Sequence, residues 1–488
     1  MSTKTVKVLE EEEEPGKLDS SSWIRIRYIQ VVLLFFMLFI CFSIRICLSV
    51  AIVAMTTNGT SSNPDVPYYN WHNSDIILSS FFWSYAILQF FAGNLAHYFG
   101  TKKLLFVTVL TNSLSCALIP VSAQYLGANG VMTLRIIQGL FQGFLLSCLN
   151  GVLGRWLPPQ ELSYINSIVF SGVYLGIVTS MIITGYISAS WYGWPAAFYL
   201  FGILGVIWCV FWYMFSAETP ASHPRISNEE RKYIEHSLGQ QDDHLSDKIS
   251  IPWMAIVKST PYWAIIIAAI GESWTSTFLY VELPSYLSYA VGLNIQDSSL
   301  FSAVPTVGAL VGALIYGPIG GLALKNGCMS KVNSRRIFQG FSIFSQTIGL
   351  LFLSYIENNA AIASVLIAAT TASSAVTCGH ILNHIDLSPR FAGILSGISN
   401  GIGQLIAILA PILVHFIVTD GTDKRLWRYT FIVGAAIGAI SAVIFIILCS
   451  AERQWWDDVD KKENEVVNEK PLSELGQINV AFREEVAQ

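Results

Sequence analysis

The sequence predicts an all-α membrane protein with twelve transmembrane helices in two six-helix halves. Hydrophobic residues make up 53% of the 488 residues and charged residues only 12%, whereas soluble proteins carry about 25% charged residues. Apolar stretches long enough to cross a bilayer, about 20 residues each, recur along the whole chain. One polar stretch, residues 216–258, separates the first six of them from the last six.

The predicted spans divide the chain into five parts. They lie near residues 29–54, 76–97, 104–123, 131–151, 166–188, 194–215, 261–283, 299–323, 336–356, 360–381, 391–417 and 427–450. The parts are a cytosolic N-terminal tail (1–27), an N-terminal half (28–215), a cytosolic linker (216–258), a C-terminal half (259–450) and a cytosolic C-terminal tail (451–488). Within the linker, residues 228–238 are predicted to form a short surface helix with Ser227 as its N-cap.

Basic residues predict the orientation of the spans. Lysine and arginine gather before helix 1, after helices 2 and 4, in the linker, and after helices 8 and 10, and all of these segments fall on one side. The opposite loops are nearly free of them, except for Lys424 and Arg425 before helix 12. The positive-inside rule therefore places both termini in the cytosol. The sequon Asn58-Gly59-Thr60 then falls in the first outer loop, where Asn58 is a candidate for glycosylation.

The two halves show a weak internal similarity. Helix 5 has glycines at positions 172, 176 and 185, and helix 11, at the corresponding place, has glycines at 397, 401 and 403. Small residues let helices approach closely, and matched glycine-rich helices are typical of repeated halves that rock around a central site. Ordinary close packing is the alternative interpretation.

Arg45 and Arg135 each lie inside a long apolar run in which nothing else is cationic. A guanidinium at membrane depth costs about 2.5–3.5 kcal/mol on insertion scales, so neither side chain is expected to face lipid. We expect both to line a polar cavity inside the helix bundle. Because the planar fork of guanidinium donors matches carboxylate and phosphate oxygens, the sequence predicts an anion-binding cavity.

Several longer segments make this prediction more specific. They are RICLSVAIVAM (45–55), SSFFWSYAILQFFAG (79–93), RIIQGLFQG (135–143), GRWLPPQELS (154–163), SWTSTFLYVELPSYL (273–287), LFSAVP (300–305) and NHIDLSPRFAGILSGISNGIG (383–403). In this order, and over nearly the whole chain except the tails, they resemble the anion/phosphate cotransporter family. That family includes sialin, the vesicular glutamate transporters and the type I sodium–phosphate cotransporters. The resemblance implies the major facilitator fold and transport by alternating access.

Single positions in helices 1 and 4 follow the family or depart from it. Arg45 and Arg135 match the family's helix 1 and helix 4 arginines, which implies that they bind the substrate anion or act in the gating that depends on it. Gln142 stands where relatives have a helix 4 glutamate linked to proton coupling, and Asn150 replaces a histidine of that helix. Because an amide does not titrate, we do not expect proton coupling through helix 4.

Two further departures concern the glutamate transporters. Leu78 stands where they have a helix 2 histidine, and Glu272 stands where they have a helix 7 arginine. Both differences disfavour vesicular glutamate transport. A carboxylate within a predicted span would pair with a cation, bind Na⁺ or titrate, so Glu272 is our candidate for ion coupling. A hydrated residue near a helix end is the alternative.

Other polar residues of the predicted helices are candidates for the transport pathway and for a gate. The pathway candidates are Gln138, Gln142, Asn150 and Tyr174, with packing hydrogen bonds between helices as the alternative. The gate candidates, which the resemblance places at the cytosolic end of helix 10, are Asn383, His384, Asp386 and Arg390. His380 and His384 share one helix face, but no third ligand with convincing spacing is nearby, so no metal site is predicted.

These observations together predict a carrier. An enzyme would need a clustered nucleophile, an acid/base pair or a metal set, and the sequence has no such motif. We therefore predict secondary-active transport of organic anions or inorganic phosphate, coupled to Na⁺ or H⁺ or driven by the membrane potential, with no cofactor. An anion channel or a multi-pass receptor is the alternative.

The same prediction names partners and a location. The expected partners are a small anionic substrate and the lipid bilayer, with no nucleic acid, and the protein is expected to work as a monomer. Neither tail carries an acidic dileucine sorting motif. We therefore expect the plasma membrane rather than a vesicular or lysosomal membrane.

Overall fold

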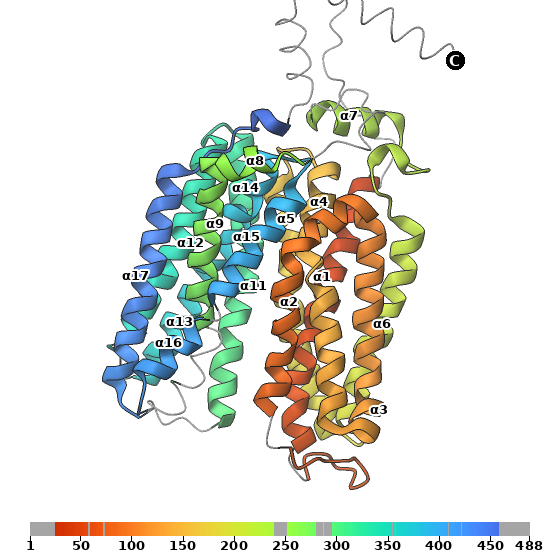
Figure 1. The fold of residues 1–488 in the computed structure, drawn as a ribbon, viewed down its shortest axis with the longest axis vertical. Coiled ribbons are helices and arrows are strands. Elements are labelled where there is room, and N and C mark those ends of the chain that lie inside the picture. The colour runs from red at the N-terminus through yellow and green to blue at the C-terminus, as the bar shows by residue number, and fades with distance from the viewer. Residues whose placement is uncertain are drawn as a thin grey trace, which may run out of the picture.

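The computed structural model describes residues 25–56, 59–71, 74–238, 251–279, 286, 295–353, 355–356, 358–407, 409–420 and 422–457. These residues form helices and connecting loops, and none of them is in a β-strand. Asn58, nearly all of both tails and residues 239–250 of the linker lie outside the described residues, so the predictions made for them stay predictions. Figure 1 shows two bundles of roughly parallel helices side by side, with α7 (Asn228–Leu238) and α8 (Trp253–Lys258) at one end. We call this end the linker end.

The N-terminal half contains six helices and the short segment that follows them. They are α1 (Ile26–Thr56), α2 (Ser74–Phe99), α3 (Thr101–Gln142), α4 (Leu145–Trp156), α5 (Leu162–Ala189), α6 (Gly193–Phe215) and the 3₁₀ turn η1 (Pro220–Ser222). Helix α3 contains predicted span 3 and the first part of span 4, and the rest of span 4 lies in α4. The chain reverses direction within α3 at Gly127, whose φ of +62° suits a residue without a Cβ. Its two arms bond to each other, since Gln138 Nε2 donates to the carbonyl O of Asn112 (3.3 Å). The predicted boundary between these spans is therefore a sharp turn rather than a loop.

The C-terminal half is built from shorter pieces. They are α9 (Thr260–Thr277), α11 (Ile295–Lys325), α12 (Lys331–Leu353), α13 (Asn359–Ser373), the 3₁₀ segment η4 (Ser374–Cys378), α14 (His380–Leu387), α15 (Ala392–Ala407), α16 (Leu409–Ile417), α17 (Lys424–Leu448) and the 3₁₀ turn η5 (Trp455–Asp457). Predicted span 10 is thus divided into α13, η4 and α14, and span 11 into α15 and α16. Across the described residues, eight helical stretches are long and apolar enough to cross a membrane, and the one from Thr101 to Trp156 includes both arms of α3.

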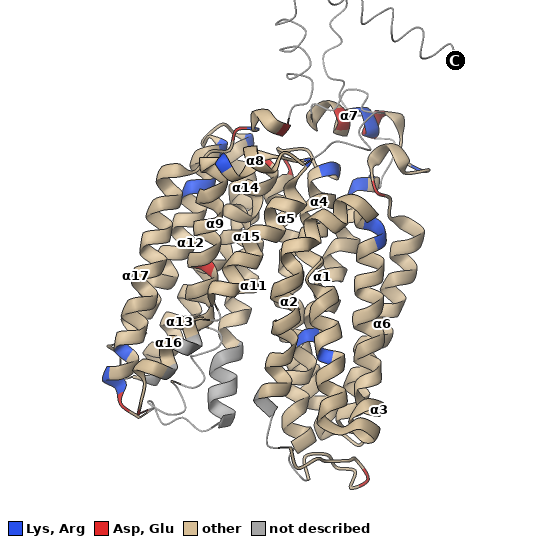
Figure 2. Ribbon diagram, in the orientation of Figure 1, with Lys and Arg blue, Asp and Glu red and all other residues tan. Residues whose placement is uncertain are grey.

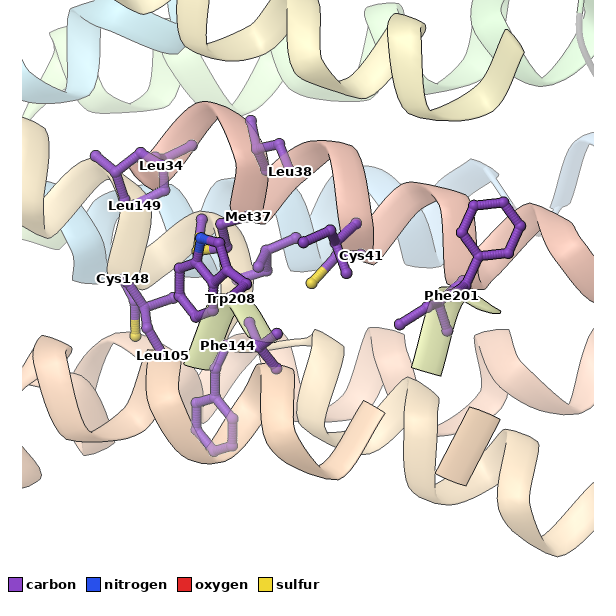
Figure 3. Packing of buried hydrophobic residues seen from close by; sticks show 14 of the residues in the cluster. Leu34, Met37, Leu38, Cys41, Leu105, Phe144, Cys148, Leu149, Phe201 and Trp208 are labelled. Atoms are coloured by element: carbon purple, nitrogen blue, oxygen red, sulfur yellow. The ribbon is translucent and has the colours of Figure 1, made fainter. Parts of the chain in front are cut away.

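The core of the N-terminal half consists of large apolar side chains from several helices. Leu34 and Met37 of α1, Leu105 of α3 and Trp208 of α6 are buried together, as Figure 3 shows. The indole Nε1 of Trp208 donates to the carbonyl O of Leu33 (2.8 Å). Lipid tails are as apolar as leucine, so close packing and such hydrogen bonds, rather than the hydrophobic effect, hold the helices together.

The first and fifth helices of each half pack against each other through glycine. A Cβ added to Gly176 of α5 would lie 2.4 Å from the carbonyl O of Phe39 on α1, and one added to Gly403 of α15 would lie 2.9 Å from the carbonyl O of Ala269 on α9. Backbone atoms cannot give way as a flexible side chain can, so each contact requires glycine. This correspondence supports the internal similarity seen in the sequence.

The two halves meet toward the linker end. Helices α2 and α4 pack against α15, and α5 packs against α11. A Cβ added to Gly397 of α15 would lie 2.7 Å from the carbonyl O of Gln89 on α2. Asn150 Nδ2 donates to Ser396 Oγ (2.7 Å), and Asn166 Nδ2 donates to the carbonyl O of Thr377 (2.6 Å). The ribbons of the two halves diverge toward the opposite end (Figure 1).

The linker helix α7 is fastened to the N-terminal half. The backbone N–H of Glu230 donates to Ser227 Oγ (3.1 Å), which is the predicted N-cap bond. The carboxylate of Glu230 accepts the backbone N–H groups of Ile26 (3.1 Å) and Arg27 (3.2 Å), where a negative charge complements the dipole of α1. Most charged residues lie at the two ends of the bundle and few lie within it (Figure 2).

Candidate functional site

Arg45 and Arg135 meet inside the N-terminal half. Arg135 lies on the second arm of α3 and is 2% exposed, whereas Arg45 on α1 is half-buried. Arg135 Nη1 donates to the backbone carbonyl O of Arg45 (3.4 Å) and to Gln138 Oε1 (3.2 Å), one helical turn away. The reversal at Gly127 is what brings this arm of α3 beside α1. The two arginines are therefore neighbours in space, although 90 positions separate them in the sequence.

Aromatic rings surround the guanidinium group of Arg45. Its central carbon lies 4.9, 4.8 and 5.1 Å from the ring centres of Phe81, Phe82 and Tyr85 on α2. The corresponding carbon of Arg135 lies 4.8 Å from the ring centre of Phe81. Rings at these distances attract a cation through their negative faces. We call Arg45, Arg135, Phe81, Phe82 and Tyr85 the arginine–aromatic site.

The arginine–aromatic site has excess positive charge. Within the part of the chain that the structure describes, no carboxylate forms a salt bridge with Arg45 or Arg135. Rings provide only a partial compensation for a full charge, and two neighbouring cations repel each other. An anion placed against both would remove this repulsion. The sequence had led us to expect polar walls here, and it did not identify the aromatic ones because aromatic residues occur throughout the chain.

The pathway candidates Gln138, Gln142 and Asn150 form hydrogen bonds between helix segments. Gln138 and Gln142 bond within the N-terminal half, and Asn150 bonds across the two halves. Gln138 joins Arg135 to the first arm of α3, as described above. Gln142 Nε2 donates to the carbonyl O of Cys41 on α1 (2.9 Å). Asn150 bonds to Ser396 across the two halves. Tyr174 is half-buried on α5.

Glu272 occupies the C-terminal half and is surrounded by neutral groups. It lies on α9 and is half-buried. Its Oε1 accepts a hydrogen bond from Gln346 Nε2 (2.6 Å) and lies 3.4 Å from Ser276 Oγ, while its Oε2 lies 3.1 Å from Ser342 Oγ. Among the described residues no cation is paired with this carboxyl group. Of the three possibilities drawn from the sequence, pairing with a protein cation therefore finds no support here.

The gate candidate Asp386 belongs to a buried ion pair. Arg335 on α12 donates to both its oxygens, Nε to Oδ2 (2.6 Å) and Nη2 to Oδ1 (3.3 Å), with side chains 1% and 3% exposed. Arg335 Nη1 also donates to the carbonyl O of Cys378 (3.1 Å) and to Ser163 Oγ on α5 (3.0 Å). The last bond joins the halves. The sequence suggested only an orientation role for Arg335, since a basic residue beside a loop is typical of the cytosolic side of any membrane protein.

The other gate candidates make contacts within the C-terminal half. Asn383 Nδ2 donates to the carbonyl O of Ser450 (2.8 Å), and His384 Nε2 lies 2.6 Å from Ser399 Oγ. His380 Nδ1 lies 2.9 Å from Gln339 Oε1, so each of the two histidines has a separate amide or hydroxyl partner. Arg390 is half-buried in the connection between α14 and α15.

A second charged cluster closes the linker end of the N-terminal half. The carboxylate of Glu218 accepts the backbone N–H groups of Thr101 (2.9 Å) and Lys102 (2.8 Å) at the start of α3 and pairs with Arg155. Burial alone would raise the pKa of Glu218, but the charge of Arg155 and these hydrogen bonds hold the pKa below its usual value. The carboxylate is therefore ionised at neutral pH and fixes α3, α4 and the segment after α6 together.

Comparisons with known proteins agree with this architecture. Residues 34–411 match the Major Facilitator Superfamily. Vesicular glutamate transporter 2 of Bos taurus is 33% identical over 435 residues, which cover 87% of this chain and 74% of that protein. A protein of Drosophila melanogaster described as "Putative inorganic phosphate cotransporter" is 30% identical over 463 residues, covering 90% and 87% of the two chains.

A solved structure shows the same fold. The proton:xylose symporter XylE, bound to 6-bromo-6-deoxy-D-glucose, superposes with a TM-score of 0.65 at 12% identity and covers 88% of this chain and 97% of its own. At this identity the likeness concerns the fold alone, and it confirms the predicted fold class. The family match and the relatives of 30% identity or more together show that this chain belongs to the Major Facilitator Superfamily of transporters, within the group that includes the vesicular glutamate transporters and the phosphate cotransporters.

Proposed function

We propose that this transporter carries a small anion, an organic carboxylate or inorganic phosphate, and binds it at the arginine–aromatic site. The observation that carries the proposal is the buried guanidinium of Arg135, which lies beside Arg45 without a carboxylate partner in the described residues. Guanidinium donors bind carboxylate and phosphate oxygens well. The names of the relatives, which refer to glutamate and to inorganic phosphate, support the same class of substrate.

The arrangement of the two halves supports alternating access. The interface between the halves is closed toward the linker end by close helix contacts and by the bonds from Asn150, Asn166 and Arg335. If the linker end is cytosolic, as the positive-inside rule indicates, these contacts between the halves lie on the cytosolic side. Breaking these few bonds and rocking the halves would then open the site to the cytosol.

Glu272 is our proposed coupling residue. It is a carboxyl group within a membrane helix, and its described partners are all neutral. A carboxyl group at membrane depth costs free energy, and residues of this kind usually have a function. Gln142 cannot exchange a proton, so Glu272 would take over the role that a helix 4 glutamate has in relatives. Function as a monomer stays a prediction from the sequence.

Uptake into proteoliposomes tests the anion site. The assay uses the full-length protein with radiolabelled phosphate, L-glutamate and sialic acid, each with imposed Na⁺, H⁺ and voltage gradients. A charge-assisted hydrogen bond contributes about 1.5–3 kcal/mol. Arg135→Lys, a point charge without the planar fork, should therefore lose roughly tenfold to a hundredfold in affinity, and Arg135→Ala should lose uptake.

Two controls make this test decisive. Arg231→Ala, which removes an arginine from the exposed Arg231–Glu235 pair of α7, should transport like the unchanged protein. Gel filtration should show that all variants are folded. Full transport by a folded Arg135→Ala variant would contradict the site. Saturable counterflow, in which internal substrate accelerates the entry of labelled substrate, would distinguish a carrier from the alternative of a channel.

The membrane in which the transporter works requires its own test. The missing dileucine motif favours the plasma membrane, but the relatives named as vesicular transporters give this preference no support. Imaging of the tagged chain beside plasma-membrane and vesicle markers would decide between the two locations. Removal of the Asn58 sequon, followed by gel mobility, would test the predicted outer loop and its glycosylation.

A further inference from the structure

The hydroxyl group of Ser342 has two oxygen partners and only one proton. Its Oγ lies 2.8 Å from the backbone carbonyl O of Ser373 and 3.1 Å from Glu272 Oε2. A backbone carbonyl can only accept a hydrogen bond, and a serine hydroxyl can donate only one. The shorter contact, to Ser373, therefore uses the proton of Ser342. Toward Glu272, Ser342 is left with lone pairs and can only accept.

The two oxygens of the Glu272 carboxyl group thus have different surroundings. Oε1 faces a donor, the amide Nε2 of Gln346 at 2.6 Å, and more distantly the hydroxyl of Ser276. Oε2 faces the acceptor Ser342. An ionised carboxylate can only accept and would leave two lone pairs facing each other at Oε2. A protonated carboxyl group fits both positions, because its C=O accepts and its O–H donates.

We propose that Glu272 is a proton-binding site that holds its proton on Oε2, and that the ion coupled to anion transport is H⁺ rather than Na⁺. The role of this site in coupling rests on the proposed function of Glu272, whereas proton binding itself does not. The hydrogen bonds form a chain from the O–H of Glu272 to Ser342 Oγ, and from the O–H of Ser342 to the carbonyl O of Ser373. The step is a simple transfer in which a hydronium ion gives one proton to the carboxylate and leaves as water.

The charged groups on the neighbouring helices do not alter this assignment. On α14, Asp386 pairs with Arg335 of α12, and His380 and His384 contact Gln339 and Ser399. Helix α15 has no charged residue. The remaining titratable or charged residues are Tyr262 near the start of α9, Lys258 on α8, Lys331 and Arg336 at the start of α12, and Lys424, Arg425, Arg428 and Tyr429 at the start of α17. The hydrogen-bond partners of Glu272 among the described residues are all neutral.

Infrared difference spectroscopy can observe this proton without any substrate. The full-length protein in lipid vesicles is titrated from low to high pH in K⁺ buffer, and the C=O stretch of protonated carboxyl groups is recorded. The protein has 33 Asp and Glu residues, so the titration of Glu272→Gln is subtracted from that of the unchanged protein. The difference should contain one carboxylic-acid band, which disappears with a single midpoint. If Glu272→Gln fails to fold, the serine variants described next provide the same test.

Ser342→Ala distinguishes the two ways of placing the proton. If Ser342 accepts from Glu272, its removal weakens proton binding, and the midpoint should fall by about one pH unit, roughly tenfold in proton affinity. If Ser342 instead donates to an ionised carboxylate, its removal should raise the midpoint, and this result would overturn the proposal. Ser345→Ala is the matched control on the same helix, because among the described residues the hydroxyl of Ser345 bonds only to backbone carbonyls of its own helix, those of Phe341 and Ser342. Its midpoint should not move.

Transport then tests the coupling. With voltage clamped and without Na⁺, an inward H⁺ gradient should accelerate phosphate or glutamate uptake severalfold, and Glu272→Gln should abolish this acceleration but keep counterflow. Acceleration by Na⁺ alone, or a Glu272 band whose midpoint falls when Na⁺ replaces K⁺, would sink the proposal. An absence of counterflow in the unchanged protein would count against the proposed function instead, and the infrared result would still decide whether Glu272 binds a proton.

Discussion

The two halves share a packing scheme but differ in the charge that they place within the membrane. In the N-terminal half the charges away from the bundle ends are the cations of Arg45, which is half-buried, and Arg135, which is buried, and both lie among aromatic rings. In the C-terminal half the corresponding feature is the single carboxyl group of Glu272, set among neutral amide and hydroxyl groups. We propose that the first half binds the anion and that the second binds the proton.

This contrast shows that close packing determines where glycine is required but does not determine which polar side chain lies between the helices. Gly176 on Phe39 in one half, and Gly403 on Ala269 in the other, place glycine against a carbonyl group because no larger residue fits. Such contacts fix how the helices lie in both halves. The identity of a polar side chain between the helices is not fixed in this way. One repeated scaffold can therefore carry an anion site in one half and an ion site in the other.

The halves also differ at the linker end. The N-terminal half uses Arg155 and Glu218, with side chains 23% and 30% exposed, whereas the C-terminal half uses Arg335 and Asp386, which are almost completely buried. Removing one partner of a buried pair leaves an uncompensated charge, which costs about 3–5 kcal/mol. A partly exposed pair contributes much less, because water screens the remaining charge.

The largest expected effect follows from this difference. Arg335→Met should destabilise the folded protein by about 3–5 kcal/mol, clearly more than Arg155→Met, as measured by thermal unfolding of the purified protein in detergent. The double variant Arg335→Met with Asp386→Leu should recover much of the loss, because neither charge then remains buried alone. Equal destabilisation by Arg335→Met and Arg155→Met would mean that the two clusters are equivalent.

A smaller effect is expected at the contact between the halves. Gly397→Leu would push a side chain against the backbone of Gln89 on α2, which cannot yield. Overpacking of this kind costs about 1–3 kcal/mol, and at about 1.4 kcal/mol for each factor of ten it should shift the population toward opening of the linker end by tenfold or more. Gly185→Leu is the matched control, since nothing lies within 4 Å of a Cβ added there.

Cys378 can report this opening. It is buried, lies 3.4 Å from Ser167 of the other half, and is one of eight free cysteines in the protein. In a background that carries Cys328→Ser, which removes the exposed cysteine, a thiol reagent should label Cys378 faster in Gly397→Leu than in Gly185→Leu. Equal labelling rates would show that the glycine contact does not keep the halves closed.

The sequence predicted the parts of the site that stand out against an apolar background. Arg45, Arg135 and Glu272 are charges within hydrophobic runs, and that contrast is visible in one dimension. The residues around them do not stand out in this way. Phe81 is one of many aromatic residues, and Ser342, about 70 positions from Glu272, is an ordinary helix serine until folding places it beside the carboxyl group.

The prediction of the fold succeeded and failed for similar reasons. Hydropathy reports how long each apolar run is, so the spans and their number could be predicted. It does not report breaks that keep the chain within the membrane, such as the division of span 10 into α13, η4 and α14. The importance of Arg335 was also hidden, because its partner Asp386 lies on another helix and the sequence does not show that the two are buried together.

The smallest effect is expected from a variant that gives the N-terminal half a titratable group of its own. Gln142 is buried, and its Nε2 donates to the carbonyl O of Cys41 on α1 (2.9 Å). In Gln142→Glu the new carboxyl group can keep this bond only when it is protonated, since a carboxylate has no proton to donate. Release of the proton would cost this bond, worth about 1 kcal/mol, and would leave a negative charge on the helix of Arg135.

Uptake by the variant should therefore gain a second pH-dependent phase, measured as phosphate or glutamate uptake against external pH. The double variant Gln142→Glu with Glu272→Gln isolates that phase, and a flat pH profile in the double variant would show that the N-terminal half cannot couple to protons even when it is given a titratable group.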